Sequence, residues 1–204
     1  MKPERLTIFP LAGAILFPRS SLPLHIFEPR YRAMVSDALA RDRRIGMVQP
    51  RDQGPVPALY DVGCVGRIAQ VDALEDGRYN IVLEGTARFR IRSELSVTTA
   101  FRQVEADLSA FMDDEPEPLP GIVRAEVERE GRRFAEARGY GVDWDAVGRI
   151  DDESLINGVA QVLPIETAAK QALLEAADLA ERADMLVQFL QFYRLTGDGR
   201  AGLQ

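Results

Sequence analysis

The spacing of apolar residues changes along the chain, from short strand-like runs in the first half to helix-like periods in the second. Three apolar runs open the chain, each too short for a helix and separated by Pro10, Gly13, Pro18 and Pro23, so they predict short strands. These runs are residues 6–9, 14–17 and 22–27. Pro29 then stands at a favoured first helical position, followed by apolar residues at helical spacing over 31–39. We therefore predict a short helix that plugs a β-rich core.

Residues 59–74 and 78–91 give the clearest strand signal of the chain. Both runs are rich in β-branched and aromatic residues, and Asp76-Gly77 between them is typical of a hairpin turn. Gly85 interrupts the alternation of the second run, which predicts a bulge or bend. A long bent hairpin of this kind is typical of small barrels. Residues 45–48 and 101–108 are two further strand candidates.

The chain becomes helical after a segment that combines acidic residues with prolines. Residues 112–121 contain three prolines and four acidic residues, which excludes a helix or a central strand and predicts a linker. Four amphipathic patterns follow, at about 122–139, 151–163, 165–177 and 178–196, and they predict a small helical bundle. The predicted parts are a β-rich domain over 1–111, an acidic Pro-rich linker over 112–121 and a helical bundle over 122–204.

Composition agrees with a globular protein: 46% of the 204 residues are apolar and 28% are charged. We expect no membrane span, because no apolar run approaches about 18 residues, and no signal peptide, because residues 1–5 lead into no continuous apolar core. The single cysteine excludes an internal disulfide and fits a reducing compartment, so we expect a cytoplasmic location.

Charge is divided unevenly between the two halves. Residues 1–111 carry 15 Lys and Arg against 13 Asp and Glu, whereas residues 112–204 carry 10 against 19, for a net charge of −7. An acidic half repels phosphate backbones, so nucleic acid is a disfavoured partner.

The residues needed for catalysis or metal binding are scarce. The chain has two lysines, neither in a glycine-rich phosphate loop, so an ATPase site of that type is excluded. One histidine and one cysteine do not build a structural zinc site, and we expect no cofactor. The acidic run Asp113, Asp114, Glu115 and Glu117 could hold a cation weakly, but a solvated linker is the favoured interpretation.

His25, the one histidine, has two interpretations. It could act as a general base. The favoured interpretation is a hydrogen bond to the backbone or to Glu28 that fixes the turn into the helix, because the sequence indicates no positioned nucleophile or orienting group. We therefore expect no catalytic residue and no enzyme.

Several motifs resemble those of a known family, and together they cover most of the chain. The motifs are Phe9-Pro-Leu, Leu16-Phe17-Pro, Pro23-Leu-His-Ile-Phe-Glu-Pro-Arg-Tyr31, Asp61-Val-Gly-Cys-Val-Gly-Arg-Ile68, Asp76-Gly-Arg-Tyr-Asn-Ile81, Leu83-Glu-Gly85, Arg88-Phe-Arg-Ile91 and, near the end, Lys170-Gln171 and Leu173-Leu-Glu175. In this order and spacing they resemble the N-terminal, substrate-binding domain of the ATP-dependent protease Lon. The resemblance implies an α+β protein: a PUA-like β pseudo-barrel with one inserted helix, followed by a C-terminal four-helix bundle. Full-length Lon proteases continue into an ATPase module and a Ser–Lys peptidase module, so the resemblance implies a recognition domain without them.

The function implied by the resemblance is non-enzymatic binding of unfolded or degron-bearing polypeptides, as an adaptor or regulator of proteolysis. A homo-oligomer is a further partner that this interpretation leaves open. The alternative is an RNA-binding PUA-like module, which the acidic balance and the lack of an aromatic–basic cluster disfavour. A hydrolase centred on His25 is the least favoured class.

Two physical modes of peptide binding are open: strand addition at a sheet edge, or an apolar groove that receives side chains. The candidate surface comprises Phe17, Leu22, Leu24, Phe27, Tyr31, Leu83 and Phe89, with Leu16 and Ile81 beside them. For each of these residues taken alone, a position in the core is favoured over a position on a binding surface. Only the exposure of several of them as one patch would favour a binding surface. We predict that His25, Glu28, Arg30 and Glu84 are structural, with an ion pair between Arg30 and Glu84 as a hypothesis.

Overall fold

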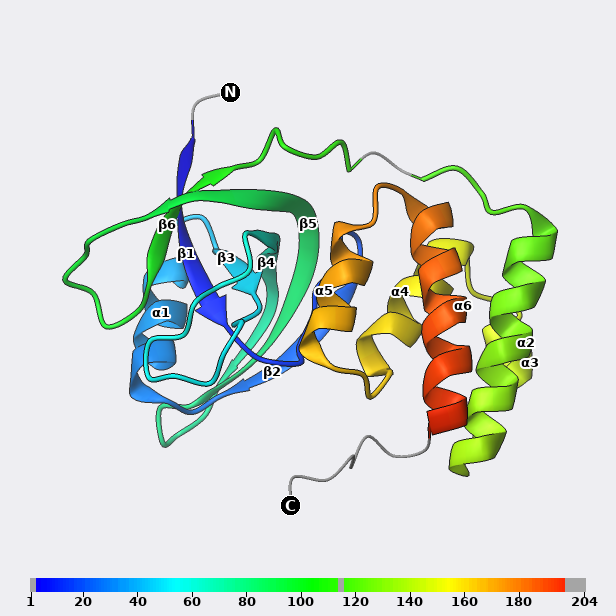
Figure 1. Ribbon diagram of the computed structural model, residues 1–204. Helices are drawn as coiled ribbons and strands as arrows, with labels where there is room; N and C mark the ends of the chain where they lie inside the picture. The colour runs from blue at the N-terminus through cyan, green and yellow to red at the C-terminus, as the bar shows by residue number, and fades with distance from the viewer. Residues whose placement is uncertain (1–2, 114–115, 197–204) are drawn as a thin grey trace, which may run out of the picture. The chain divides into compact units, whose positions relative to one another are not determined.

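The protein divides into two compact units, Met1–Asp114 and Glu115–Gln204. Its structure is a computed structural model that describes residues 3–113 and 116–196 (Figure 1). We call residues 3–113 the sheet unit and residues 116–196 the helical unit. The division falls inside the predicted linker, and the elements agree with the predicted α+β class. Asp114, Glu115 and residues 197–204, for which a linker and the end of the bundle are predicted, lie outside the described residues.

The sheet unit is built on six strands and one helix. The strands are β1 (Glu4–Pro10), β2 (Ser21–Ile26), β3 (Arg44–Val48), β4 (Val62–Ala73), β5 (Tyr79–Glu94) and β6 (Gln103–Asp107). They form one sheet in the order β2-β5-β4-β3-β1-β6, and a further pairing between β5 and β6 closes five of them into a ring (Figure 1). β1 and β3 are parallel, and the other pairs are antiparallel. The assignment as a PUA-like pseudo-barrel stays a prediction.

β5 can pair with strands at both of its ends because the β4–β5 hairpin bends sharply. Opposite Val65 and Gly66 of β4 the register skips a residue of β5, which places a bulge beside Gly85. A Cβ atom added to Gly85 would lie 1.9 Å from the carbonyl oxygen of Phe17, so this close approach of two backbones requires glycine. The bend predicted at Gly85 is confirmed, as is the turn at Asp76-Gly77, where Gly77 has a positive φ of 79°.

The prediction of a short strand at 14–17 is wrong. This segment contains no regular secondary structure. Ser20 closes a turn, because its hydroxyl donates to the carbonyl oxygen of Phe17 and accepts from the Phe17 N–H, at 2.8 and 3.0 Å. Ile15, Leu16 and Phe17 are nevertheless buried, so apolar character here marks a core segment without strand pairing.

Helix α1 (Pro29–Leu39) begins at Pro29 as predicted and buries Tyr31, Met34, Val35 and Ala38. The core of the ring itself is apolar and tightly enclosed. It contains Leu6, Ile8, Val48, Val65, Phe89, Val104 and Ala106, each at most 4% exposed. Such burial removes large apolar side chains from water and is the main stabilising contribution in this unit.

The helical unit contains four long helices and one single-turn helix. They are α2 (Gly121–Arg138), α3 (Trp144–Val147), α4 (Asp152–Val162), α5 (Thr167–Glu175) and α6 (Leu179–Thr196). The four long helices lie where their apolar periods predict them, whereas α3 is too short to produce a period. Arg182 lies buried among three helices, donating to Asn157 of α4 and to the Leu173 carbonyl of α5, both at 2.9 Å. The assignment as a four-helix bundle stays a prediction.

The acidic segment does not behave as one solvated run. The Asp113 carboxylate accepts from Arg88 Nε at 2.8 Å, and the two side chains are only 8% and 4% exposed. The solvated interpretation is therefore wrong for Asp113, because a buried guanidinium in β5 pairs with it. Glu117 is exposed.

Candidate functional site

The structure separates the seven candidate surface residues into a buried set and an exposed set. Phe17, Leu83 and Phe89 are fully buried, and Tyr31 is 7% exposed. These four side chains belong to the core, the interpretation that each of them alone favoured. They do not form a surface on which a ligand can rest.

The exposed set lies on β2 and the residue that follows this strand. Leu22 and Leu24 are half-buried, and Phe27 is 59% exposed. The Phe27 ring stacks near the His25 ring, with 6.1 Å between the ring centroids. The sequence-based candidate surface is thus reduced to three side chains, two on β2 and one directly after it.

The four residues predicted to be structural have other partners than expected. His25 lies opposite Asn80 in the β2–β5 register, and its Nδ1 is 2.7 Å from Asn80 Oδ1. The predicted bond to Glu28 is therefore wrong. Arg30 and Glu84 do not pair either: Arg30 pairs with Glu28 at 2.9 Å, two residues away in sequence. Glu84 pairs across the hairpin with Arg67, also at 2.9 Å, because the two residues are opposite each other in the β4–β5 register.

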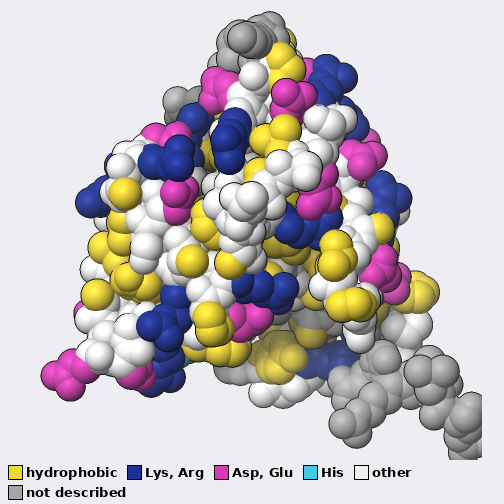
Figure 2. All heavy atoms as spheres, turned by 90° about the vertical axis from the view of Figure 1, so that its left-hand side faces the viewer, with side chains coloured by type: hydrophobic (Ala, Val, Ile, Leu, Met, Phe, Trp, Pro, Cys, Tyr) yellow, Lys and Arg dark blue, Asp and Glu magenta, His cyan; other side chains and the backbone are white. Residues whose placement is uncertain are grey.

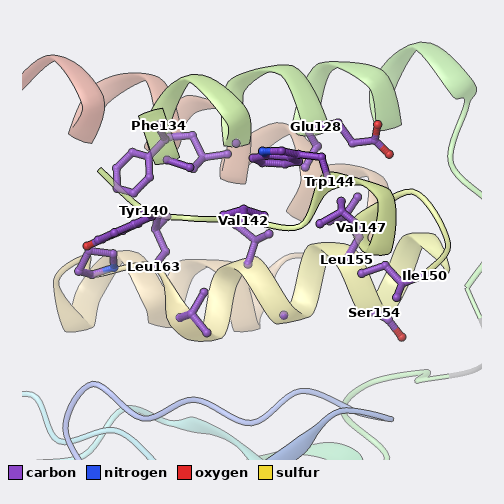
Figure 3. Close-up of a pocket in the computed structure, with 18 residues that line it drawn as sticks. Glu128, Phe134, Tyr140, Val142, Trp144, Val147, Ile150, Ser154, Leu155 and Leu163 are labelled. Atoms are coloured by element: carbon purple, nitrogen blue, oxygen red, sulfur yellow. The ribbon is translucent and has the colours of Figure 1, made fainter. Parts of the chain in front are cut away.

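The helical unit contains an apolar groove that the sequence analysis did not predict. It lies between α2 and α4, along the connection that joins these helices through α3, and has a volume of about 270 Å³ (Figure 3). The residues that line it are mainly apolar: Val127, Phe134, Ala135, Tyr140, Val142, Trp144, Val147, Ile150, Leu155, Val159, Val162, Leu163, Pro164 and Leu190, with Glu128, Gly131, Ser154 and Gly158.

Helix ends in the sequence shape this groove. Gly139 adopts a positive φ of 70° and ends α2, and the Tyr140 N–H returns to the Ala135 carbonyl at 2.9 Å. The Asp143 side chain then caps α3 and the Asp151 side chain caps α4. These three signals turn the chain so that Tyr140, Val142 and Trp144 lie along the groove (Figure 3).

Arg124 holds the three helices around the groove in place. It donates to Asp152 of α4 at 2.6 Å, to Glu128 of α2 at 2.9 Å and to the Val147 carbonyl of α3 at 3.2 Å. The hydrogen bond from Arg124, together with one from the Leu119 N–H, lowers the pKa of Asp152. A charge-assisted network, whose members Glu128 and Val147 also line the groove, therefore fixes the groove wall.

The groove lining has the chemistry of a binding site for apolar groups. Tyr140 is 53% exposed, Val162 80% and Ile150 41%, so part of the lining faces solvent. Trp144 is the one tryptophan of the chain, and the Arg132 guanidinium lies 4.5 Å from its ring centroid. Large aromatic walls of this kind bind apolar side chains, and the groove contains no paired acid and base for catalysis.

The groove residues gave only a faint signal in the sequence. Tyr140, Val142 and Trp144 alternate with small or polar residues between two helices, which also fits a loop with a few buried anchors. The described residues hold no group of three or more His, Cys, Asp or Glu side chains that could bind a metal ion. Within residues 3–113 and 116–196, no helix is both long and apolar enough to cross a membrane.

Comparison with known proteins identifies the family. The family model of the ATP-dependent protease La (LON) substrate-binding domain matches residues 5–191. The chain belongs to this family. The match includes both the sheet unit and most of the helical unit, so the Lon substrate-binding domain extends over both.

Relatives of this Lon substrate-binding domain include longer proteins named Lon proteases. Lon protease 2 of Sorangium cellulosum (strain So ce56) is 30% identical over 200 residues, which cover 90% of this chain and 24% of that protein. Lon protease of Escherichia coli (strain K12) is 26% identical over 204 residues, which cover 94% of this chain and 26% of that protein. The chain thus spans about a quarter of the length of these relatives.

Solved structures share the fold of this Lon substrate-binding domain. The N-terminal domain of Mycobacterium avium complex Lon protease aligns with a TM-score of 0.68 at 21% identity, covering 93% of this chain and all of that one. The Lon N-terminal domain protein from Xanthomonas campestris aligns with a TM-score of 0.67 at 22% identity, covering 91% of this chain and 98% of that one. At these identities the likeness concerns the fold alone.

Proposed function

We propose that this Lon substrate-binding domain binds polypeptide segments without catalysing a reaction, and that it does so by placing their apolar side chains in the groove of the helical unit. The observation that carries the proposal is the groove itself, open to solvent and lined almost entirely by apolar side chains. In this role the chain serves Lon-type proteolysis as an adaptor or regulator.

An apolar groove can bind ligands of varied sequence. Burial of one Leu or Phe side chain contributes about 1.5–3 kcal/mol and requires no particular hydrogen-bond pattern. One anchor alone therefore binds weakly, and a segment with several apolar residues binds better. Unfolded or degron-bearing chains expose such segments, whereas folded proteins bury them.

RNA binding receives less support. The helical unit carries 9 Lys and Arg against 15 Asp and Glu over residues 116–196. On the face drawn in Figure 2, basic side chains alternate with acidic ones and form no continuous basic area. Phosphate backbones bind chiefly through clustered cations, so neither surface favours them.

Trp144 provides a direct test, because the single tryptophan lines the groove. The probe is a short peptide with leucine and phenylalanine anchors and no tryptophan, and its control is the same peptide with serine at the anchors. We expect saturable changes in Trp144 emission with the first peptide only, insensitive to salt. Equal response to both peptides, or salt-sensitive retention of RNA in place of peptide, contradicts the proposal.

Gly158 offers a position at which a larger side chain can block the groove. This helical glycine lines the groove, and a Cβ atom added to it meets no heavy atom within 4 Å. Gly158→Phe should fill the groove and weaken peptide binding about 10-fold or more, the loss of roughly one anchor. Gly158→Ala leaves the groove open, and Gly121→Phe adds the same ring at another open helical position outside it. Both controls should bind as the parent chain does.

The adaptor or regulator role needs a separate assay. The chain is added to a Lon protease that degrades an unfolded protein, and the rate of degradation is measured with the parent chain and with Gly158→Phe. A changed rate with the parent chain alone supports the role. No effect of either chain contradicts it while leaving peptide binding intact.

A further inference from the structure

β2 differs from the other strands of the sheet unit in its pairing. Among the strands of residues 3–113, β1, β3, β4, β5 and β6 each have at least two strand partners, whereas β2 pairs with β5 alone. The pairing of β5 with β6 removes the edge at the other end of the sheet. β2 is thus the edge strand among residues 3–113, and over Pro23–His25 this edge presents backbone donors and acceptors to another chain.

The direction of the backbone groups on β2 follows from its register. The Ser20 carbonyl accepts from the Gly85 N–H at 2.9 Å, and Ser21 lies opposite Glu84 without a register shift along the strand. The backbone N–H and C=O groups of successive residues point to opposite edges of a strand. Those of residues 22, 24 and 26 therefore point toward β5, and those of residues 23 and 25 point away from it. The nitrogen of Pro23 therefore lies on the open side, where a missing N–H does not disturb the β2–β5 ladder.

The open side of β2 carries the chemistry of a strand partner. It presents the Pro23 carbonyl and both the N–H and the carbonyl of His25. Leu22 and Leu24 are half-buried and Phe27 is 59% exposed, so an added strand would also cover apolar surface. On the outer face, Pro23, His25, Asn80 and Val82 border a shallow hollow of about 430 Å³ that can receive alternate side chains of such a strand.

We propose that β2 binds an extended polypeptide segment as an additional strand. The occupant is an extended chain, because only an extended backbone matches outward donors and acceptors at the spacing of every second residue. Its preferred sequence alternates β-branched or apolar residues with polar ones. The inference goes beyond the proposed function, since this site lies in the other unit and depends on backbone hydrogen bonds instead of apolar anchors.

The test compares peptides that differ only in which of their backbone N–H groups are methylated. The probe is a fluorescein-labelled peptide of alternating valine and threonine, and binding to the full chain is measured by fluorescence anisotropy. N-methylation of every second residue blocks one edge of the peptide, and N-methylation of the other residues blocks the opposite edge. We expect binding of the unmodified peptide, a loss of about 10-fold or more with one methylated peptide, and near-parent binding with the other. Equal affinities for all three peptides overturn the proposal.

Three substitutions on β2 sharpen the test. Pro23→Ala adds an outward N–H and should tighten binding about 2- to 10-fold, the effect of one hydrogen bond. His25→Pro removes the outward N–H of His25 and should weaken binding by a similar factor, while His25→Ala removes only the side chain and should not. If circular dichroism shows that His25→Pro does not fold, Pro23→Ala and the methylated peptides still decide the outcome.

The two sites can fail independently. Gly158→Phe should leave binding of the valine–threonine peptide unchanged, and Pro23→Ala should leave the groove peptide unchanged. Loss of the valine–threonine peptide in Gly158→Phe assigns it to the groove and overturns strand addition. A dimer in sedimentation velocity that His25→Pro dissociates also overturns it, because the edge would then be occupied by a second copy of β2.

Discussion

Arg88 and Asp113 form a buried ion pair at the end of the sheet unit. Arg88 Nε donates to Asp113 Oδ1 at 2.8 Å, the Arg88 N–H donates to Asp113 Oδ2 at 2.5 Å, and both side chains are under 10% exposed. The Phe111 ring packs against the same guanidinium, 4.5 Å from its centre, and Arg19 donates to the Asp113 carbonyl at 2.7 Å. Residues 111–113 are therefore held against β5, and the chain leaves the sheet unit from a fixed point.

Arg88→Ala should destabilise the sheet unit by about 3–5 kcal/mol, because it leaves a buried carboxylate without its cationic partner. Urea unfolding followed by circular dichroism measures this loss. The matched control is Arg67→Ala, whose ion pair with Glu84 is about half exposed and should contribute under about 1 kcal/mol. Equal losses for the two variants would mean that the Arg88–Asp113 pair is not buried in solution.

Gly85→Ala should destabilise the sheet unit more than the roughly 1–3 kcal/mol typical of an overpacked core. The added Cβ would lie 1.9 Å from the Phe17 carbonyl oxygen, and backbone atoms yield less than a flexible side chain. Thermal unfolding gives the measurement.

Gly158→Ala is the opposite case among the glycines. The new Cβ meets open space in α4, and alanine loses less backbone entropy than glycine on helix formation. We expect a gain of about 0.5–1 kcal/mol in the free energy of unfolding of the helical unit. Denaturant unfolding monitored by Trp144 emission measures it, and a loss of stability would show that the groove side of α4 is more crowded than the structure indicates.

The Arg124–Asp152 contact predicts how the helical unit responds to acid. The pKa of Asp152 is lowered in the folded state, chiefly by the hydrogen bond from Arg124. The unfolded state then binds more protons as the pH falls, so the stabilisation is complete above the unfolded pKa of about 3.9 and is lost as pH falls through the lower folded value. Asp152→Asn should make the stability of the helical unit less dependent on pH below about 4.

Urea unfolding between neutral and acid pH, monitored by Trp144 emission, tests the Asp152 prediction. Glu136→Gln, on the exposed side of α2, removes one carboxylate outside the Arg124 network and serves as the control. An unchanged acid dependence in Asp152→Asn would show that the Arg124 contact does not set it.

Substitutions around Phe27 should leave the stability of the sheet unit almost unchanged. Phe27 is 59% exposed, and the Arg30–Glu28 pair has exposed fractions of 49% and 41%. Phe27→Ala and Arg30→Ala should each alter the free energy of unfolding by less than about 1 kcal/mol, as measured by urea titration. A larger loss of unfolding free energy in Arg30→Ala would show that Arg30 contributes to stability beyond its exposed ion pair with Glu28.

Local sequence signals determined much of the fold. Apolar periods located the four long helices and α1, and Asp76-Gly77 and Gly85 marked the turn and the bend of the main hairpin, because each signal acts on neighbouring residues through backbone geometry. The quoted motifs also led to the correct family, since they lie in order along most of the chain.

Only the tertiary structure decided which apolar side chains face solvent and which charges pair. Phe17, Leu83 and Phe27 are equally apolar in sequence, yet only Phe27 is exposed, because burial depends on what packs on each face. Arg88 and Asp113 are 25 residues apart in the sequence. The groove is lined by α2, by α4 and by the segment that connects them, and the apolar residues of this segment show no clear periodicity. Periodicity shows that a residue faces a core, but the partner across that core is set by long-range packing that one sequence window does not contain.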